Sequence, residues 1–110
     1  MIEVDKYPNT RGGFHNFYVG RPTPLSNPFK MRENCKHTRA ERDRVCDLYE
    51  EYFQKEVKIK GSKIRNSVAN LYRLAKSGKN ILLLCHCHPK RCHADTIKRF
   101  LEEQLTKETK

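Results

Sequence analysis

The chain has 110 residues, and its 23 Lys and Arg against 13 Asp and Glu give a formal charge of +10 at neutral pH. This length fits one domain with a modest core, and no apolar run is long enough to form a transmembrane helix, so we expect no membrane partner. The basic charge favours a nucleotide, a nucleic acid or another anionic partner. A well-solvated surface is the simpler explanation of the same charge.

The start of the chain and its cysteines indicate the compartment. Residues 1–5 include two acidic side chains and lack the apolar core of a secretory leader, so we expect a cytoplasmic protein. The five cysteines are an odd number, and three of them fall within residues 85–92. This crowding favours reduced thiols over a disulfide scaffold.

Two short strands are the first expected elements. Ile2 and Val4 alternate with polar residues, and residues 14–20 form an apolar segment after a turn at 9–13. Residues 20–29 then contain three prolines, which exclude a helix or a central strand there. We expect a stiff loop that presents functional side chains to a ligand.

Two helices follow. Thr38 to Glu41 form a capping box, so a helix should begin there and continue to about residues 55–57. Ser62 should cap a second helix, which Gly78 ends. The region from Lys55 to Lys79 contains eight Lys and Arg and one Glu, which makes it the most basic part of the chain.

The last elements are a strand, a Cys/His loop and a helix. Residues 81–84 are a short apolar run typical of a buried strand, and a helix should begin near Asp95, with a loose tail from about residue 106. This order predicts a single α/β domain over residues 1–110, a sandwich of two or three layers with a short, largely parallel sheet and about three helices. In a parallel sheet the loop at 20–29 and the Cys/His loop meet at one edge, so we expect them to face each other across one crevice.

The Cys/His loop contains candidate metal ligands. Thiolates and imidazoles are the usual zinc ligands, so Cys85, Cys87, Cys92 and His93 form one possible zinc site. The C-x-C and adjacent C-H spacings depart from the usual C-x₂₋₄-C pairs. The remaining candidates are His86, His88 and the remote pair Cys35 and His37.

The same loop supports a nucleophilic interpretation. Cys92 should lie at a helix start beside Lys90, Arg91 and His93, an environment that lowers a thiol pKa. Cys92, His93 and Asp95 would then be catalytic, either as a thiolate with an imidazole base or around a metal-held water. In the purely structural alternative, Cys85 and Cys87 are small side chains buried at the end of a strand. The position of Asp95 in the first helical turn is then explained by its favourable interaction with the helix dipole.

Two motifs together resemble a known family. Residues 20–29 are G-R-P-T-P-L-S-N-P-F, and residues 85–95 are C-H-C-H-P-K-R-C-H-A-D. Both blocks resemble the family known as domain of unknown function 4326, whose members are short phage, bacterial and archaeal proteins. Ser26 stands where that family usually has Gly. The resemblance implies a small α/β fold with a paired-loop site, and it implies no particular reaction.

These features lead to one preferred function and two alternatives. We expect a nucleotide- or nucleic-acid-phosphate-binding domain that acts as a small nucleotide-processing enzyme. Phosphate would be held by Arg21, Lys90 and Arg91, and a sugar or base by Ser26 and Asn27. The first alternative is a zinc-stabilised nucleic-acid-binding module without catalysis, which uses the basic region at 55–79. The second is a basic protein-interaction module that binds an acidic partner.

Overall fold

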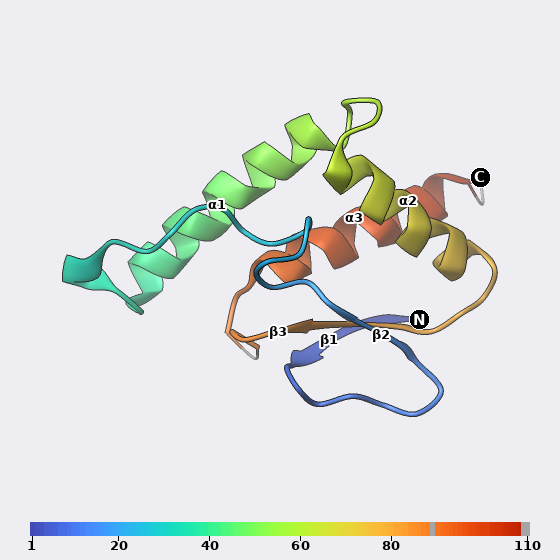
Figure 1. The fold of residues 1–110 in the computed structure, drawn as a ribbon, viewed down its shortest axis with the longest axis horizontal. Helices are drawn as coiled ribbons and strands as arrows, with labels where there is room; N and C mark the ends of the chain where they lie inside the picture. Colours follow the sequence, from blue (N-terminus) through green and yellow to red (C-terminus); the bar gives the residue numbers. More distant parts are fainter. Residues whose placement is uncertain (89, 109–110) are drawn as a thin grey trace.

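The computed structural model describes residues 1–88 and 90–108, and these form the small α/β fold that the sequence predicts (Figure 1). Its regular elements are β1 (Ile2–Lys6), β2 (His15–Tyr18), a short 3-10 helix η1 (Glu33–Cys35), α1 (Arg39–Glu56), α2 (Lys63–Lys76), β3 (Ile81–Cys85) and α3 (His93–Glu108). None of the described helices combines the length and apolarity that crossing a membrane requires.

The three strands form one parallel sheet in the order β1-β3-β2. In the ladders Lys6 pairs with Cys85 and Tyr18 pairs with Leu84, so all three strands end at the same edge. The central strand β3 is buried over its whole length, which explains its continuous apolar sequence. The loops that follow β2 and β3 therefore leave the sheet side by side.

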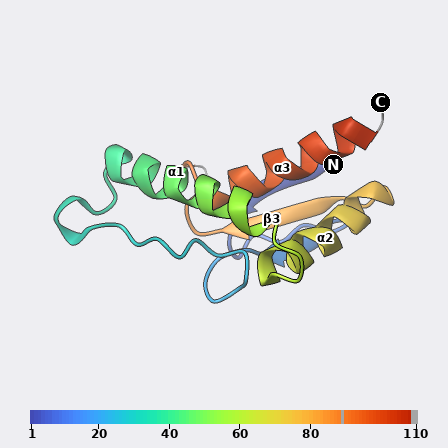
Figure 2. The same ribbon diagram turned by 90° about the horizontal axis from the view of Figure 1, so that it is seen from above.

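The helices cover only one face of this sheet (Figures 1 and 2). Helix α3 contacts β1 and β3, and α2 lies beside α3 and contacts β3. Ile81 and Leu83 point into this layer, where they join one core with Ile97, Leu101 and apolar side chains of α1 and α2. The fold therefore has two layers, which resolves the choice between two and three.

The connection between β1 and β2 protects the opposite face. Leu82 and Leu84 alternate with the core side chains of β3, yet both are buried. Their strand neighbours in β1 are Glu3 and Asp5, and the Arg11 guanidinium forms ion pairs with both carboxylates. Arg11 also lies 5.3 Å from the centre of the Phe14 ring. The connection between β1 and β2 therefore covers this face in place of a second layer of helices.

Helix α1 begins at the predicted cap, but only half of the capping box forms. The Thr38 hydroxyl accepts a hydrogen bond from the Glu41 amide at 3.2 Å. The buried Glu41 carboxylate instead binds the Arg32 amide and the guanidinium groups of Arg32 and Arg44. These bonds fasten the segment at 27–38 alongside α1, beyond the edge of the sheet (Figure 2).

The remaining boundaries differ slightly from the predicted ones. Ser62 caps α2 through the Arg65 amide, and Gly78, with a φ of 87°, follows its end, as predicted. Strand β2 covers residues 15–18 rather than 14–20. Helix α3 begins at His93 and continues to Glu108, so residues 106–108 are helical where we expected a loose tail. Residues 109–110 of that expected tail lie outside the described part of the chain.

Candidate functional site

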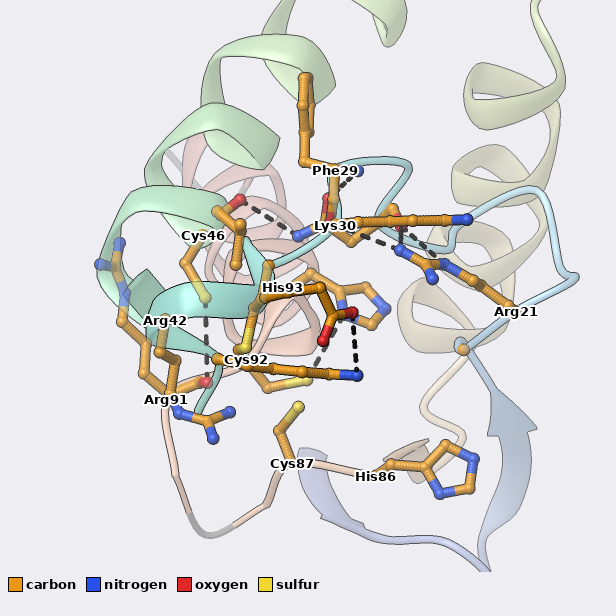
Figure 3. Close-up of a pocket in the computed structure, with 16 residues that line it drawn as sticks. Arg21, Phe29, Lys30, Arg42, Cys46, His86, Cys87, Arg91, Cys92 and His93 are labelled. Atoms are coloured by element: carbon orange, nitrogen blue, oxygen red, sulfur yellow. Dashed lines mark hydrogen bonds and ion pairs between the residues drawn. The ribbon is translucent and has the colours of Figure 1, made fainter. Parts of the chain in front are cut away.

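The two loops at the carboxyl edge of the sheet line one pocket of about 380 Å³ (Figure 3). The expected juxtaposition of these loops is therefore confirmed. The segment at 30–36 and the first turns of α1 complete the walls. The described lining residues are Gly20, Arg21, Asn27, Phe29, Lys30, Met31, Glu33, Lys36, Arg42, Val45, Cys46, His86, Cys87, Arg91, Cys92 and His93.

Positive charge dominates this lining. It contains five Lys and Arg side chains, whereas Glu33 is the single acidic side chain among the described lining residues. Lys36 pairs with Glu33 at 3.7 Å. No described carboxylate lies within ion-pair distance of Arg21, Lys30 or Arg42. The pocket is therefore electrostatically suited to an anion.

The loop at 20–29 is fixed to α1 by its own polar groups. The Asn27 amide nitrogen donates to the Val45 carbonyl at 3.1 Å, and the buried Tyr49 hydroxyl donates to the Leu25 carbonyl at 2.8 Å. Arg21 donates to the carbonyl oxygens of Asn27 and Phe29 across the loop. These hydrogen bonds hold the loop against α1.

Gly20 is required by the packing of β2. A Cβ atom at this position would lie 2.3 Å from the Tyr18 hydroxyl oxygen. That hydroxyl also lies 2.8 Å from Nε2 of His86. The glycine therefore allows the two loops to approach each other at the sheet edge.

Three cysteine thiols interact at the base of the pocket, and two of them, Cys87 and Cys92, line it. Cys85 and Cys92 are buried, whereas Cys87 is half-buried and faces the pocket (Figure 3). Interaction with the Cys92 thiol lowers the pKa of both Cys87 and Cys85. The Arg42 guanidinium beside Cys87 lowers the pKa of that thiol further.

The same contacts act in the opposite direction on Cys92. Interaction with Cys85 and Cys87, together with burial, raises the pKa of the Cys92 thiol. The lowered pKa that we expected for Cys92 at the helix start is therefore wrong. Burial and the two neighbouring thiols favour the protonated form of Cys92, so thiolate character falls to its neighbours.

His93 is held in one orientation next to this cluster. Its Nε2 lies 2.6 Å from the Val19 carbonyl oxygen, and its Nδ1 lies 3.4 Å from the Cys92 sulfur. Because a carbonyl only accepts, Nε2 carries the proton and Nδ1 is left as the acceptor for the thiol. Burial lowers the pKa of His93, which keeps the ring neutral.

The other predicted site residues separate into two groups. Arg91 lines the pocket and forms ion pairs with Asp43 at 3.2 Å and Asp47 at 2.8 Å, which fasten the Cys/His loop to α1. The Asp95 carboxylate accepts the Cys92 amide at 3.1 Å and so caps α3. Asp95, Ser26 and Lys90 lie outside the set of described residues that line the pocket.

Sequence reasoning missed Arg42, Lys30 and Lys36 as pocket residues. Arg42 precedes Val45 and Cys46 by three and four positions, so it occupies the inward face of α1, and this spacing could have identified it. Lys30 and Lys36 lie on an irregular segment whose path depends on Glu41 and Arg32. No local pattern in that segment predicts its path.

The geometry lends no support to the zinc site. Among the described residues, no three His, Cys, Asp or Glu side chains are arranged to hold a metal ion. The zinc site at Cys85, Cys87, Cys92 and His93 stays a prediction, which metal analysis of the purified protein would test.

Comparison with known proteins gives a family and no function. The sequence profile of the family described as Domain of unknown function (DUF4326) matches residues 2–103. No curated protein and no solved structure matches the chain. Because the matched region covers nearly the whole sequence, the chain belongs to the DUF4326 family.

Proposed function

We propose that this protein binds a nucleotide through its phosphate in the pocket between the two loops, and that it is a small nucleotide-processing enzyme. One observation carries the proposal. Arg21, Lys30 and Arg42 line a pocket of about 380 Å³, and no described carboxylate pairs with any of them. Charge-assisted hydrogen bonds from such groups are the strongest contacts available to a phosphate.

The size and the remaining lining support the same ligand class. The volume lies within the range of roughly 300–1,000 Å³ typical of small-molecule sites. Phe29 and Met31 supply apolar surface that suits a base, and the Phe29 ring is held edge-on against Tyr52 at 5.9 Å. Arg21 and Lys30 flank the pocket opposite Arg42 and Arg91 (Figure 3).

For the enzymatic part, we propose the thiols and imidazole at the pocket floor as the reactive group. Cys87 faces the ligand space, and Cys92 and His93 lie directly behind it. Asp95 holds the Cys92 amide, so we propose a positioning role for it rather than contact with substrate. Turnover would then depend on Cys87 at least as strongly as on Cys92.

Calorimetric titration with the nucleoside monophosphates tests the binding proposal. Arg21→Gln and Lys30→Gln should each weaken binding about tenfold, the effect of losing one charge-assisted contact. Lys63→Gln, an exposed position on α2, is the matched control and should bind like the wild type. Equal affinities in all three variants, or no binding of any nucleotide, would contradict the proposal.

A second candidate function rests on a different surface. All eight Lys and Arg from Lys55 to Lys79 are exposed, and they lie on the end of α1, the α1–α2 turn, α2 and the residues just after α2. This surface suits the phosphate backbone of a nucleic acid, or an acidic protein, without catalysis. Retention of an oligonucleotide that is abolished by Lys58→Gln and Lys63→Gln, but not by Arg21→Gln, would favour this alternative.

A further inference from the structure

The three thiols at the pocket floor suggest an activity that does not depend on nucleotide binding. We propose that Cys87 and Cys92 form a redox-active pair, in which Cys87 reacts with a hydroperoxide and Cys92 then closes an intramolecular disulfide. Neither residue forms a disulfide in the structure, and both line the pocket through which a small oxidant would enter.

Cys87 is positioned as the thiol that reacts first. It is half-buried and open to the pocket, and its sulfur lies beside the Cys92 thiol and the Arg42 guanidinium. Arg42 is only 9% exposed, and no described carboxylate pairs with it. A buried guanidinium favours a negative charge beside it, and Cys87 is the pocket thiol that lies beside Arg42.

Cys92 is positioned as the thiol that reacts second. Its side chain is buried and points toward Cys87 (Figure 3), and the two residues belong to the irregular loop between β3 and α3. Nδ1 of His93 lies 3.4 Å from the Cys92 sulfur and is free to accept its proton, because Nε2 donates to the Val19 carbonyl. The second thiol therefore has a base in contact with it.

The chemistry balances without a metal or cofactor. The Cys87 thiolate attacks one oxygen of the hydroperoxide, the O–O bond breaks, and an alcohol or water leaves after taking a proton. Cys87 is then a sulfenic acid. Cys92 gives its proton to His93, and its sulfur attacks the Cys87 sulfur and displaces hydroxide, which leaves as water with that proton. Both sulfurs are oxidised and the peroxide is reduced.

The other cysteines lack one of these features. Cys85 is fully buried at the end of the central strand. Burial raises the pKa of Cys46 to about 11, and its thiol faces the Arg91 carbonyl at 3.8 Å. Cys35 lies on η1, away from the cluster. Cys35→Ser is therefore the matched control.

Mass spectrometry of the reduced full chain treated with hydrogen peroxide tests the proposal. Disulfide formation removes two hydrogens, about 2 Da, and dithiothreitol should restore them. Lys90 and Arg91 lie between the two cysteines, so trypsin should release residues 80–90 and 92–98 as one disulfide-linked pair. Fragmentation of that pair, and its persistence in Cys85→Ser, should assign the bond to Cys87.

Variants separate the two steps. In Cys92→Ser the reaction should stop at the Cys87 sulfenic acid, which dimedone traps. Cys87→Ser should abolish the reaction of the pocket thiols with peroxide. Arg42→Gln should slow the first step about tenfold, whereas His93→Gln should slow only disulfide closure. Cys35→Ser should behave like the wild type.

Two results would overturn the proposal. One is oxidation of Cys87 no faster than that of Cys35, and the other is a peroxide-induced disulfide that joins a different pair. Cys87 is half-buried, so we expect Cys87→Ser to fold. This variant therefore still tests the proposal if the buried substitution Cys92→Ser prevents folding. Nucleotide titration of the same variants distinguishes failure of this proposal from failure of the proposed binding function.

Discussion

The pocket and the basic surface of α2 carry the same sign of charge in different ways. Pocket cations converge from two loops and one helix on a single volume, and Arg42 among them is buried. The Lys and Arg side chains at 55–79 are all exposed and spread along a turn and a helix. Total charge therefore does not locate the site. Convergence and desolvation distinguish a ligand pocket from a solvated surface.

Among the variants that separate the pocket from the α2 surface, Glu41→Gln should have the largest effect on ligand binding. The carboxylate holds the segment at 27–38 through Arg32 and Arg44, so its loss should release one pocket wall and abolish nucleotide binding. Oligonucleotide binding by the α2 surface should be unchanged. Calorimetry with both ligands measures the difference, and retained nucleotide affinity would show that this wall is not needed.

Glu41 should also affect how the free energy of unfolding decreases at acidic pH. Hydrogen bonds from Arg44 and Arg32 lower the pKa of Glu41 below its ordinary value of 4.5. Ionised Glu41 therefore stabilises the fold above that value, and the contribution is lost as pH falls through the lowered pKa. Urea unfolding between pH 7 and pH 2 should show a shallower acid decline for Glu41→Gln. Parallel curves would contradict this role.

Gly20→Ala should disturb the pocket through its packing rather than its charge. The new Cβ would lie 2.3 Å from the Tyr18 hydroxyl oxygen, so the ring must move and its contact with His86 must break. We expect a loss of about 1–3 kcal/mol in the free energy of unfolding. Gly12→Ala, where the added Cβ meets nothing within 4 Å, is the control and should leave urea unfolding unchanged.

Tyr49→Phe should have a smaller effect. It removes the buried hydrogen bond to the Leu25 carbonyl, which fastens the loop at 20–29 to α1. The expected loss is about 1–2 kcal/mol in unfolding free energy, with a modest decrease in nucleotide affinity. An unchanged urea midpoint would mean that Asn27 alone holds the loop.

The smallest effect should come from the α2 surface. If oligonucleotides bind there, each of Lys58→Gln and Lys63→Gln should reduce the slope of log affinity against log salt by about one unit. Nucleotide binding in the pocket should not change. Filter-binding at several salt concentrations measures this slope. If either substitution also weakened mononucleotide binding, the pocket and the α2 surface would not be separate binding sites.

Local patterns predicted the elements and the shared sheet edge. The apolar run at 81–84, the caps at Thr38 and Ser62 and the prolines at 20–29 each act on neighbouring residues, so their consequences are visible in the sequence. Parallel pairing then requires that the two loops meet. These steps need no knowledge of side-chain packing.

The errors concern residues that meet only in space. The pKa of Cys92 depends on Cys85 and Cys87 as partners, and their effect opposes that of the helix start. Glu41 binds Arg32 and Arg44 instead of completing its capping box, because the irregular segment folds back on α1. Arg42 is a partial exception, since helical spacing puts it on the buried face.

Titration of labelled protein with a nucleoside monophosphate, followed by NMR, tests the central claim most directly. We expect saturable chemical-shift changes at residues that line the pocket, above all Arg21, Lys30 and Cys87, and none along α2. Shifts confined to residues 58–79, or no saturable shift at millimolar nucleotide, would contradict the assignment of this pocket as a nucleotide site.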